Sequence, residues 1–294
     1  MGKDRRTTSA AHFEAEDVVA EYATFDFLLP PERAILDRIA DRITDARMLD
    51  IGVGGGRTTT HLAHRVRRYV GIDVSAAMIA ACRRRFEDRV SDRLRFLVAD
   101  ARDLAPFETG SFDVVLFSWQ GIDSIDLEGR VMALREIRRV CASGARFAFS
   151  SDNILWARDQ RSFVRSIRRA MSRGDGSRDL RAVPYEIVRA ISSTRRIRMI
   201  NHSASLRGGQ GQFIYRRPRF ELNSEGFADP GELIEIDGCV IAPSAQVAQL
   251  GDCGFRNVRI LDPGGSDVTA RSDRSLRRWE WLYYLATAGR TDVT

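Results

Sequence analysis

The stretch MLDIGVGGGRTT at residues 48–59 decides the fold of this chain of 294 residues. It predicts the end of a buried strand, then a glycine loop, then the start of a helix. Glycine lets the backbone adopt positive φ angles and approach a ligand closely. The first turn of the helix offers free N–H groups and the positive end of the helix dipole. The stretch therefore predicts a ligand-binding loop, with the acid Asp50 just in front of its first glycine.

The chain on either side of this loop alternates between strands and helices. Hydrophobic patterns predict helices between 13 and 44 and at 58–66, 75–86 and 130–140, and strands at 47–51, 69–73, 94–100, 112–118 and 144–151. A helix at 244–250 and strands at 255–261 and 281–286 follow later in the chain. This alternation predicts an α/β fold with a doubly wound, mostly parallel sheet.

The regular alternation stops at Ser151 and resumes only at Ser244. The intervening segment, residues 152–243, is called the cap below. Its pattern predicts amphipathic helices at 160–171 and 184–194 and extended pieces at 213–215 and 233–241, which makes it a mixed insertion. We therefore divide the chain into an N-terminal tail and helical lid (1–33), a core (34–151 and 244–294) and the cap.

The glycine loop does not match the dinucleotide pattern. That pattern, G-x-G-x-x-G, needs a third glycine at its sixth position. Counting from Gly52 puts Arg57 there, and counting from Gly54 puts Thr59 there. The loop sequence therefore does not predict a nicotinamide or flavin cofactor.

The pattern that is present, D-x-G-x-G-x-G, is formed by Asp50, Gly52, Gly54 and Gly56. It resembles the first motif of the class I S-adenosylmethionine-dependent methyltransferases. The resemblance implies a seven-stranded Rossmann-like sheet, with S-adenosylmethionine as the cofactor. It also implies that Asp50 supports the amino acid end of the cofactor, while Gly52 and Gly54 admit its methionine portion.

Residues at the ends of the next two predicted strands extend the resemblance. Asp73 would accept the ribose hydroxyls, as an acid at this place does in dinucleotide folds as well. By the same resemblance, Val74 and Met78 would pack on the adenine. Asp100 would accept from the adenine amino group, and Ala101 would offer a backbone N–H to a ring nitrogen.

Three further residues are assigned to the methionine end of the cofactor. Ser118 and Trp119, at the end of the fourth predicted strand, would line the methyl-donor side. Tyr22 lies on the N-terminal helix, which methyltransferases of this shape often fold over the cofactor. Its hydroxyl would then contact the cofactor carboxylate; an ordinary packed tyrosine is the alternative.

Transfer of a methyl group from a sulfonium needs positioning and desolvation. A hydroxyl or protonated amine acceptor also needs a base. The candidate catalytic residues are Asp123, His202 and Asp152, with Tyr185 as a further possibility. Asp152 and the asparagine after it resemble the metal pair of catechol-type O-methyltransferases. Because Ser118 stands where those enzymes have a third, acidic ligand, we predict no metal site.

Charge and cysteine usage bear on the chemistry of the acceptor and on the cellular location of the protein. The net charge is +6, and the cap alone holds 16 Arg against 11 Asp plus Glu. These arginines either form a solvated face or clamp a carboxylate or phosphate on the acceptor. The four cysteines have no C-x-x-C spacing, which favours free thiols and a cytoplasmic location. No apolar run is long enough for a membrane helix, the N-terminus lacks a signal-like apolar region, and oligomerisation stays open.

The predicted function is methyl transfer to a small-molecule acceptor: a metabolite, a sugar or an intermediate of secondary metabolism. One alternative is an RNA or DNA methyltransferase that uses the basic cap. Against it, the SWQG sequence at 118–121 lacks the proline motif of amino-methylating enzymes, and the cap lacks interleaved aromatic residues. The other alternative is a non-catalytic protein that binds S-adenosylmethionine.

Overall fold

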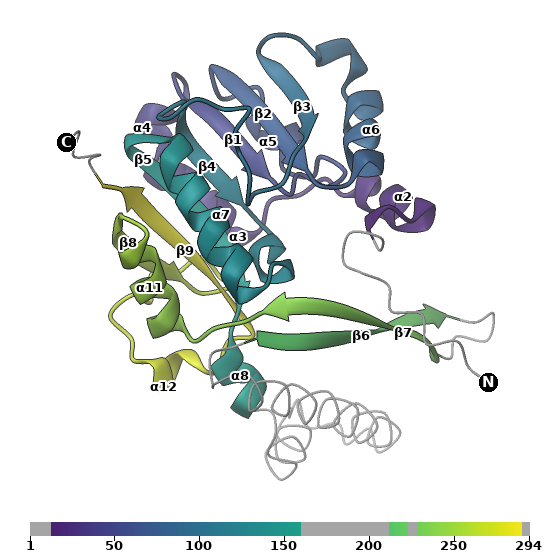
Figure 1. Cartoon of the computed structure of the whole chain (residues 1–294), viewed down its shortest axis with the longest axis vertical. Helices are drawn as coiled ribbons and strands as arrows, with labels where there is room; N and C mark the ends of the chain where they lie inside the picture. Colours follow the sequence, from purple (N-terminus) through teal and green to yellow (C-terminus); the bar gives the residue numbers. More distant parts are fainter. Residues whose placement is uncertain (1–12, 160–211, 223–227, 290–294) are drawn as a thin grey trace, which may run out of the picture.

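The computed structural model describes residues 13–159, 212–222 and 228–289 (Figure 1). Its main sheet has seven strands in the order β3-β2-β1-β4-β5-β9-β8. They are β1 (Arg47–Ile51), β2 (Arg68–Asp73), β3 (Leu94–Val98), β4 (Phe112–Phe117), β5 (Cys141–Asp152), β8 (Phe255–Leu261) and β9 (Trp281–Ala288). The pairs from β3 through β5 are parallel, and β9 runs antiparallel to both β5 and β8. The predicted fold class is confirmed.

Helices cover both faces of this sheet. One hydrophobic cluster joins the sheet to α3 (Pro30–Arg38), α4 (Ala40–Ile43), α5 (Thr59–Leu62) and α6 (Ala76–Arg85). A second cluster joins the opposite face to α7 (Leu127–Val140), α11 (Pro243–Asp252) and α12 (Asp273–Leu276). Burial on both faces explains the near-continuous apolar runs of β1, β2 and β4.

Local signals set most of the helix starts. Two prolines open α3, where the missing N–H is not needed. The Ser75 side chain accepts from the Met78 N–H and caps α6, as expected from its position. Helix α7 begins three residues earlier than predicted, because Asp126 caps it by accepting from the Gly129 N–H.

The predicted end of one helix and start of one strand also differ from the structure by several residues. Helix α5 ends at Leu62 rather than at 66, because the following turn brings the Arg67 and Arg68 N–H groups onto the Ala46 carbonyl. Strand β5 begins at Cys141 rather than at 144, because Cys141 already pairs with Phe112 of β4.

The chain order of the sheet reverses between β1 and β4, which both flank the glycine loop. Strand β1 leads to β2 on one side, whereas β4 leads to β5 on the other. In open α/β sheets, ligands bind outside the carboxyl ends of the strands at such a switch point. The N-terminal helix α2 (Glu16–Thr24) packs on α6 beside it. The topology therefore places a ligand between the glycine loop, α2 and the end of β4.

The described part of the cap includes a long hairpin. The short helix α8 (Ile154–Asp159) follows β5, and the strands β6 (Gln212–Leu222) and β7 (Ala228–Cys239) pair antiparallel. In Figure 1 this hairpin projects from the edge of the sheet where β5 ends. The extended pieces predicted at 213–215 and 233–241 fall within it, whereas the predicted helices at 160–171 and 184–194 lie outside the described residues. The domain division itself stays a prediction.

Candidate active site

The glycine loop has the backbone geometry that its sequence predicts. Gly52, Gly54 and Gly56 have φ angles of 64°, 56° and 85°, a region that residues with a side chain rarely adopt. Gly55 is needed for a different reason, since a Cβ there would lie 2.4 Å from the backbone carbonyl of Tyr22. The N-terminal helix is thus pressed directly against the loop.

Asp73 lies beside this loop at the end of β2. One carboxylate oxygen accepts from the Gly54 N–H at 2.9 Å, and the other accepts from the Ser75 N–H at 2.9 Å. Each oxygen can accept a second hydrogen bond, so the carboxylate can still receive two hydroxyls. Burial raises the pKa of Asp73, although these backbone bonds oppose the shift. The geometry fits the ribose of S-adenosylmethionine.

The residues predicted to hold the adenine differ in their surroundings. Val74 is 48% exposed, as an apolar wall for a ligand would be. Met78, on α6, is instead buried against α2. The Asp100 carboxylate is engaged by Arg102 at 2.5 Å, and these bonds lower its pKa although burial opposes them. An adenine amino group would therefore share Asp100 with Arg102, next to the buried Ala101.

Asp50 points beneath the loop. It accepts hydrogen bonds from the hydroxyls of Thr58 and Tyr69, both at 2.5 Å, and is 1% exposed. Burial raises its pKa to about 6, against the lowering effect of these two bonds. Asp50 therefore braces the loop from inside, and any support for the amino acid end of the cofactor would pass through the loop backbone.

This raised pKa predicts a specific pH dependence. The ordinary pKa of aspartate is about 4, so between about pH 4 and pH 6 the native state binds more protons than the unfolded state. The contribution of Asp50 to the free energy of unfolding therefore falls by about 3 kcal/mol in total as the pH rises through this range. Urea unfolding of the wild type and of Asp50→Asn measures this. From pH 4.5 to pH 7, the unfolding free energy of the wild type should fall relative to that of the variant. Asp45→Asn, at an exposed position before β1, is the control, and a difference independent of pH would refute the assignment.

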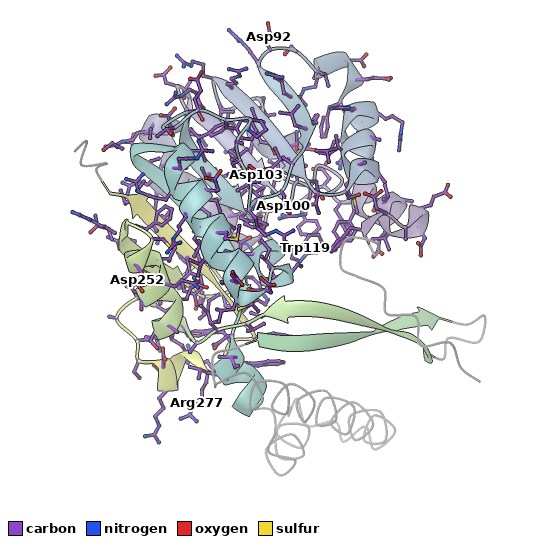
Figure 2. The ribbon with its side chains drawn as sticks, in the orientation of Figure 1. Asp92, Asp100, Asp103, Trp119, Asp252 and Arg277 are labelled. Atoms are coloured by element: carbon purple, nitrogen blue, oxygen red, sulfur yellow. The ribbon has the colours of Figure 1, made fainter. Side chains whose placement is uncertain are left out.

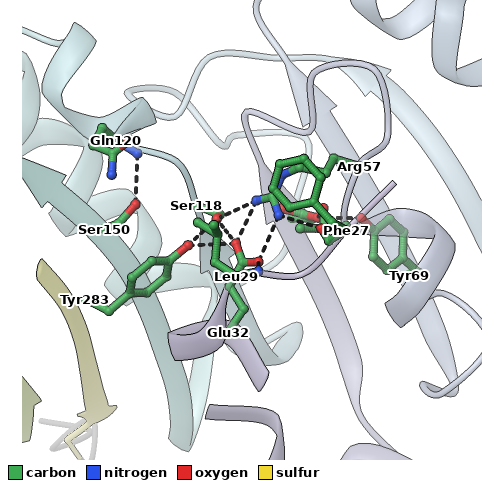
Figure 3. Close-up of polar contacts among 11 residues, drawn as sticks. Phe27, Leu29, Glu32, Arg57, Tyr69, Ser118, Gln120, Ser150 and Tyr283 are labelled. Carbon is green, nitrogen blue, oxygen red and sulfur yellow. Dashed lines mark hydrogen bonds and ion pairs between the residues drawn. The ribbon is translucent and has the colours of Figure 1, made fainter. Parts of the chain in front are cut away.

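A buried charged network lies behind the loop (Figure 3). Arg57 donates to both carboxylate oxygens of Glu32 on α3, at 2.8 and 2.6 Å, and to the Ser118 hydroxyl at 2.9 Å. Tyr283 of β9 donates to the same Glu32 carboxylate at 2.7 Å and contacts Ser118. Burial would raise the pKa of Glu32, but the bonds and charge of Arg57 lower it. Ser118 thus lies within this network, at 8% exposure.

Trp119 forms the exposed wall next to this network. It is 38% exposed, and its ring centroid lies 5.6, 5.2 and 5.9 Å from those of Tyr22, Phe25 and Phe27. The guanidinium of Arg57 lies 5.1 Å from the Trp119 ring. In the view of Figure 2, Trp119 lies between α2 and α7. These rings form an apolar surface next to the end of β4, where the methyl-donor side is predicted.

The backbone of this wall is strained. Trp119 and its neighbour Gln120 have φ angles of 54° and 57°, and Gln120 is held by a hydrogen bond from its N–H to the Ser150 hydroxyl at 2.8 Å. Such strain persists where the surrounding structure imposes it, and it concentrates at functional sites.

The candidate catalytic residues are only partly described. Asp123 is buried in an ion pair with Arg130 of α7 at 2.8 Å, and its other oxygen accepts from the Asp152 N–H at 2.6 Å. Asp152 is half-buried at the end of β5. His202 and Tyr185 lie outside the described residues, as do the side chains of the cap arginines. The catalytic assignments of Asp123, Asp152 and His202 therefore stay predictions.

Asn153, the second member of the resembled metal pair, is engaged elsewhere. Its side-chain amide donates to the carbonyls of Leu276 and Trp279 at 3.0 and 3.1 Å, and its oxygen accepts from the Leu155 N–H. Within residues 13–159, 212–222 and 228–289, no group of three or more His, Cys, Asp or Glu side chains is placed to hold a metal ion.

The lid formed by α2 is latched to the core through Glu14. Its carboxylate accepts from the Ala76 and Ala77 N–H groups in the first turn of α6, at 2.7 and 3.2 Å. Arg85 of α6 continues the connection by donating to the carbonyls of Phe25 and Gly55 at 3.0 and 2.9 Å. The lid, α6 and the glycine loop are thus held together at the predicted cofactor site.

Releasing this latch should accelerate ligand exchange. We expect Glu14→Ala to increase the dissociation rate of S-adenosylhomocysteine several-fold, because α6 loses two acceptors that also hold the lid down. Stopped-flow displacement measures this rate. Glu21→Ala, exposed on the lid helix, should leave it unchanged. Equal rates in all three proteins would show that the latch does not control exchange.

Comparisons with known proteins agree with this geometry. Residues 48–144 match the family model described as a methyltransferase domain. The chain is 35% identical over 114 residues to a demethylmenaquinone methyltransferase of Clavibacter sepedonicus, which covers 39% of this chain and 44% of the relative. It is 34% identical over 82 residues to a magnesium-protoporphyrin O-methyltransferase of Rhodobacter capsulatus, covering 28% and 35%. The chain thus spans less than half the length of these curated relatives.

Solved structures support the fold over a larger share of the chain. An S-adenosylmethionine-dependent methyltransferase of Methanosarcina mazei matches with a TM-score of 0.54 at 17% identity, covering 86% of this chain and 98% of that one. The CcbJ methyltransferase of Streptomyces caelestis matches with a TM-score of 0.57 at 13% identity, covering 93% and 96%.

Residues 48–144 therefore match a methyltransferase domain, and the seven-stranded sheet has the fold of solved S-adenosylmethionine-dependent methyltransferases. S-adenosylmethionine, which carries an activated methyl group on a sulfonium, stays the predicted cofactor. None of the described helices is long and apolar enough to cross a membrane.

Proposed function

We propose that the protein transfers a methyl group from S-adenosylmethionine to a small-molecule acceptor: a metabolite, a sugar or an intermediate of secondary metabolism. The observation that carries this proposal is the exposed Trp119 wall on its strained backbone, directly after β4 at the switch point. A planar apolar wall beside the methyl-donor side can bind and desolvate a small acceptor. Both curated relatives described above are named for small-molecule acceptors.

The described residues support positioning more directly than proton removal. The Trp119 wall can orient the acceptor, and Asp73 with the glycine loop can orient the cofactor, which together bring the reacting groups into line. The charges closest to the wall are paired, because Arg57 neutralises Glu32 and Arg130 neutralises Asp123. A base from the cap, such as His202, would be added where the acceptor needs one.

We also propose an anionic acceptor and a cytoplasmic location. The concentration of arginine in the cap supports an acceptor that carries a carboxylate or phosphate. The free cysteines, of which Cys82, Cys141 and Cys239 are buried, support a cytoplasmic location. Oligomerisation stays open.

An RNA methyltransferase is the second candidate. The chain is 34% identical over 85 residues to a relative from Geobacter metallireducens named ribosomal RNA small subunit methyltransferase A, which covers 27% of this chain and 31% of that protein. The net positive charge of the cap also favours an anionic polymer. Nucleic acid that co-purifies at low salt and is released at high salt would support this candidate.

Labelled methyl transfer tests the proposal. Purified protein, S-[methyl-³H]adenosylmethionine and a cell extract are incubated, and the small-molecule, nucleic acid and protein fractions are counted. We expect label in the small-molecule fraction, and its loss with Asp73→Ala. Label in the nucleic acid fraction would favour the second candidate. Label in no fraction, from a protein that binds S-adenosylhomocysteine, would indicate a non-catalytic binding protein.

A further inference from the structure

A buried arginine of the core contacts the end of the cap hairpin. Arg130 lies on α7 with no exposed surface. Its three guanidinium nitrogens all donate hydrogen bonds, and no part of the group reaches water. The acceptors are the carbonyls of Ile122 and Cys239, the side-chain oxygens of Asp123, Ser151 and Gln246, and that of Gln249.

These acceptors belong to four separate segments. Ile122 and Asp123 lie on the one-turn helix η2 (Gly121–Ser124), which follows Trp119. Ser151 is the next-to-last residue of β5, where the chain enters the cap, and Cys239 is the last residue of β7, where the chain leaves it. The two glutamines lie on α11. Strand β7 also packs on η2 directly. Both roots of the cap thus meet the loop that carries the Trp119 wall, and Arg130 lies at the meeting point.

The carboxylate of Asp123 completes the junction. One oxygen accepts from Arg130 at 2.8 Å and from the Ser151 hydroxyl at 2.7 Å, and the other accepts from the Asp152 N–H at 2.6 Å. Asp123 is only 7% exposed. A carboxylate that is buried, paired and bonded in this way is poorly placed to take a proton from an acceptor.

We propose that Arg130 is a positioning residue that fixes the cap hairpin to the Trp119 loop, and that Asp123 is its structural counter-ion rather than the general base. The acceptor site is thereby assembled from core and cap as one unit. Arginine is suited to this role because its rigid planar fork holds five donors on three nitrogens, whereas lysine has three donors on a single nitrogen. The inference rests on the proposed function, since it describes how that site is built.

Arg130→Lys keeps the charge but loses the fork, and is therefore the main test variant. Hydrogen exchange followed by mass spectrometry on the full chain should show about 10-fold faster exchange or more at 119–125 and 233–239, because local opening there loses its restraint. Exchange in β1 to β3 and the dissociation constant of S-adenosylhomocysteine should stay within about 2-fold of wild type. Unchanged exchange at 119–125 and 233–239 would overturn the proposal.

Arg139→Lys is the matched control on the same helix. Arg139 is also multiply bonded, but to Glu136 and to the carbonyls of Leu104 and Phe107, away from the cap. Its effect on exchange should remain near 104–107. Faster exchange at 233–239 in this control would show that general loosening of α7, and not the Arg130 contacts, explains the result, and would overturn the proposal.

A double-mutant cycle on methyl transfer separates positioning from base catalysis. With the small-molecule fraction of unreacted cell extract as acceptor, Arg130→Lys, Asp123→Asn and the double variant should show similar losses of rate at limiting acceptor, because both residues act in one unit. Recovery of rate at saturating acceptor is expected for a positioning role. If Asp123→Asn alone abolishes transfer at every acceptor concentration and leaves exchange at 233–239 unchanged, Asp123 is the base and the proposal is wrong.

Different results would contradict the proposed function and the proposed role of Arg130. A wild-type protein that does not bind S-adenosylhomocysteine would contradict the methyltransferase function, whatever the exchange rates of the hairpin. Normal cofactor binding with an unaltered hairpin in Arg130→Lys would contradict only the Arg130 junction.

Discussion

Arg57→Met should lower the free energy of unfolding by about 3–5 kcal/mol, which is the usual cost of leaving a buried charge without its partner. The Glu32 carboxylate would lose both bonds from Arg57 while remaining buried at 3% exposure. Urea unfolding followed by circular dichroism measures the change. The fluorescence of Trp119 should shift as well, because Arg57 lies against its ring.

Two further variants show whether the ion pair causes this loss. Glu32→Gln together with Arg57→Met removes both charges but keeps an acceptor for Tyr283, so it should recover much of the stability. Arg47→Met breaks a more exposed pair with Asp113 and should cost no more than about 1 kcal/mol. An Arg57→Met variant as stable as the wild type would contradict the buried network.

Asp73→Ala should weaken the binding of S-adenosylhomocysteine by roughly 2–4 kcal/mol, about 30- to 1,000-fold. The variant loses two hydrogen bonds from the ribose to a carboxylate. It also loses the acceptor that fixes the Gly54 and Ser75 N–H groups, so the glycine loop is less well ordered before the ligand arrives. Isothermal titration calorimetry measures the dissociation constant.

Two other aspartates, one after β3 and one before it, provide the controls for Asp73→Ala. Asp100→Ala should cost less than Asp73→Ala, because Arg102 already occupies the Asp100 carboxylate. Asp92→Ala, at an exposed position before β3, should have no effect. Equal affinity of the wild type and Asp73→Ala would show that the ribose does not bind there.

The predictions for the cofactor side rest on signals that are local in the sequence. The glycines, Asp73 and Asp100 each stand at the end of an apolar run, and the carboxyl ends of parallel strands meet at one edge of the sheet. In the structure, Asp73 accepts from the Gly54 N–H of the glycine loop. Met78 is buried under the lid, which the sequence did not indicate, since no pattern shows which side of α6 the N-terminal helix covers.

The residues that sequence reasoning missed are held by distant contacts. Tyr283 is 251 residues from Glu32, yet the two share a hydrogen bond. A signal was nevertheless present for two of the missed residues. Glu32 lies on the apolar stripe of α3 with Ile35 and Leu36, and Arg130 lies on the stripe of α7 with Leu134. A charged residue on an apolar stripe predicts a buried partner.

The acceptor side was less predictable because it is assembled from separate parts of the chain. The Trp119 wall combines Trp119, which follows β4, with the aromatic rings of Tyr22 and Phe25 from the N-terminal segment. No spacing in the sequence relates these residues. The junction at Arg130 similarly joins four segments. Candidate bases could be named only by residue type, and no sequence pattern indicates that Asp123 pairs with the buried Arg130.

The central claim is that this chain holds S-adenosylmethionine, and ligand-induced thermal stabilisation tests it most directly. The account predicts that S-adenosylhomocysteine raises the melting temperature of the wild type in a saturable manner, raises that of Asp73→Ala much less, and that NAD has no effect. Stabilisation by NAD without stabilisation by S-adenosylhomocysteine would contradict it.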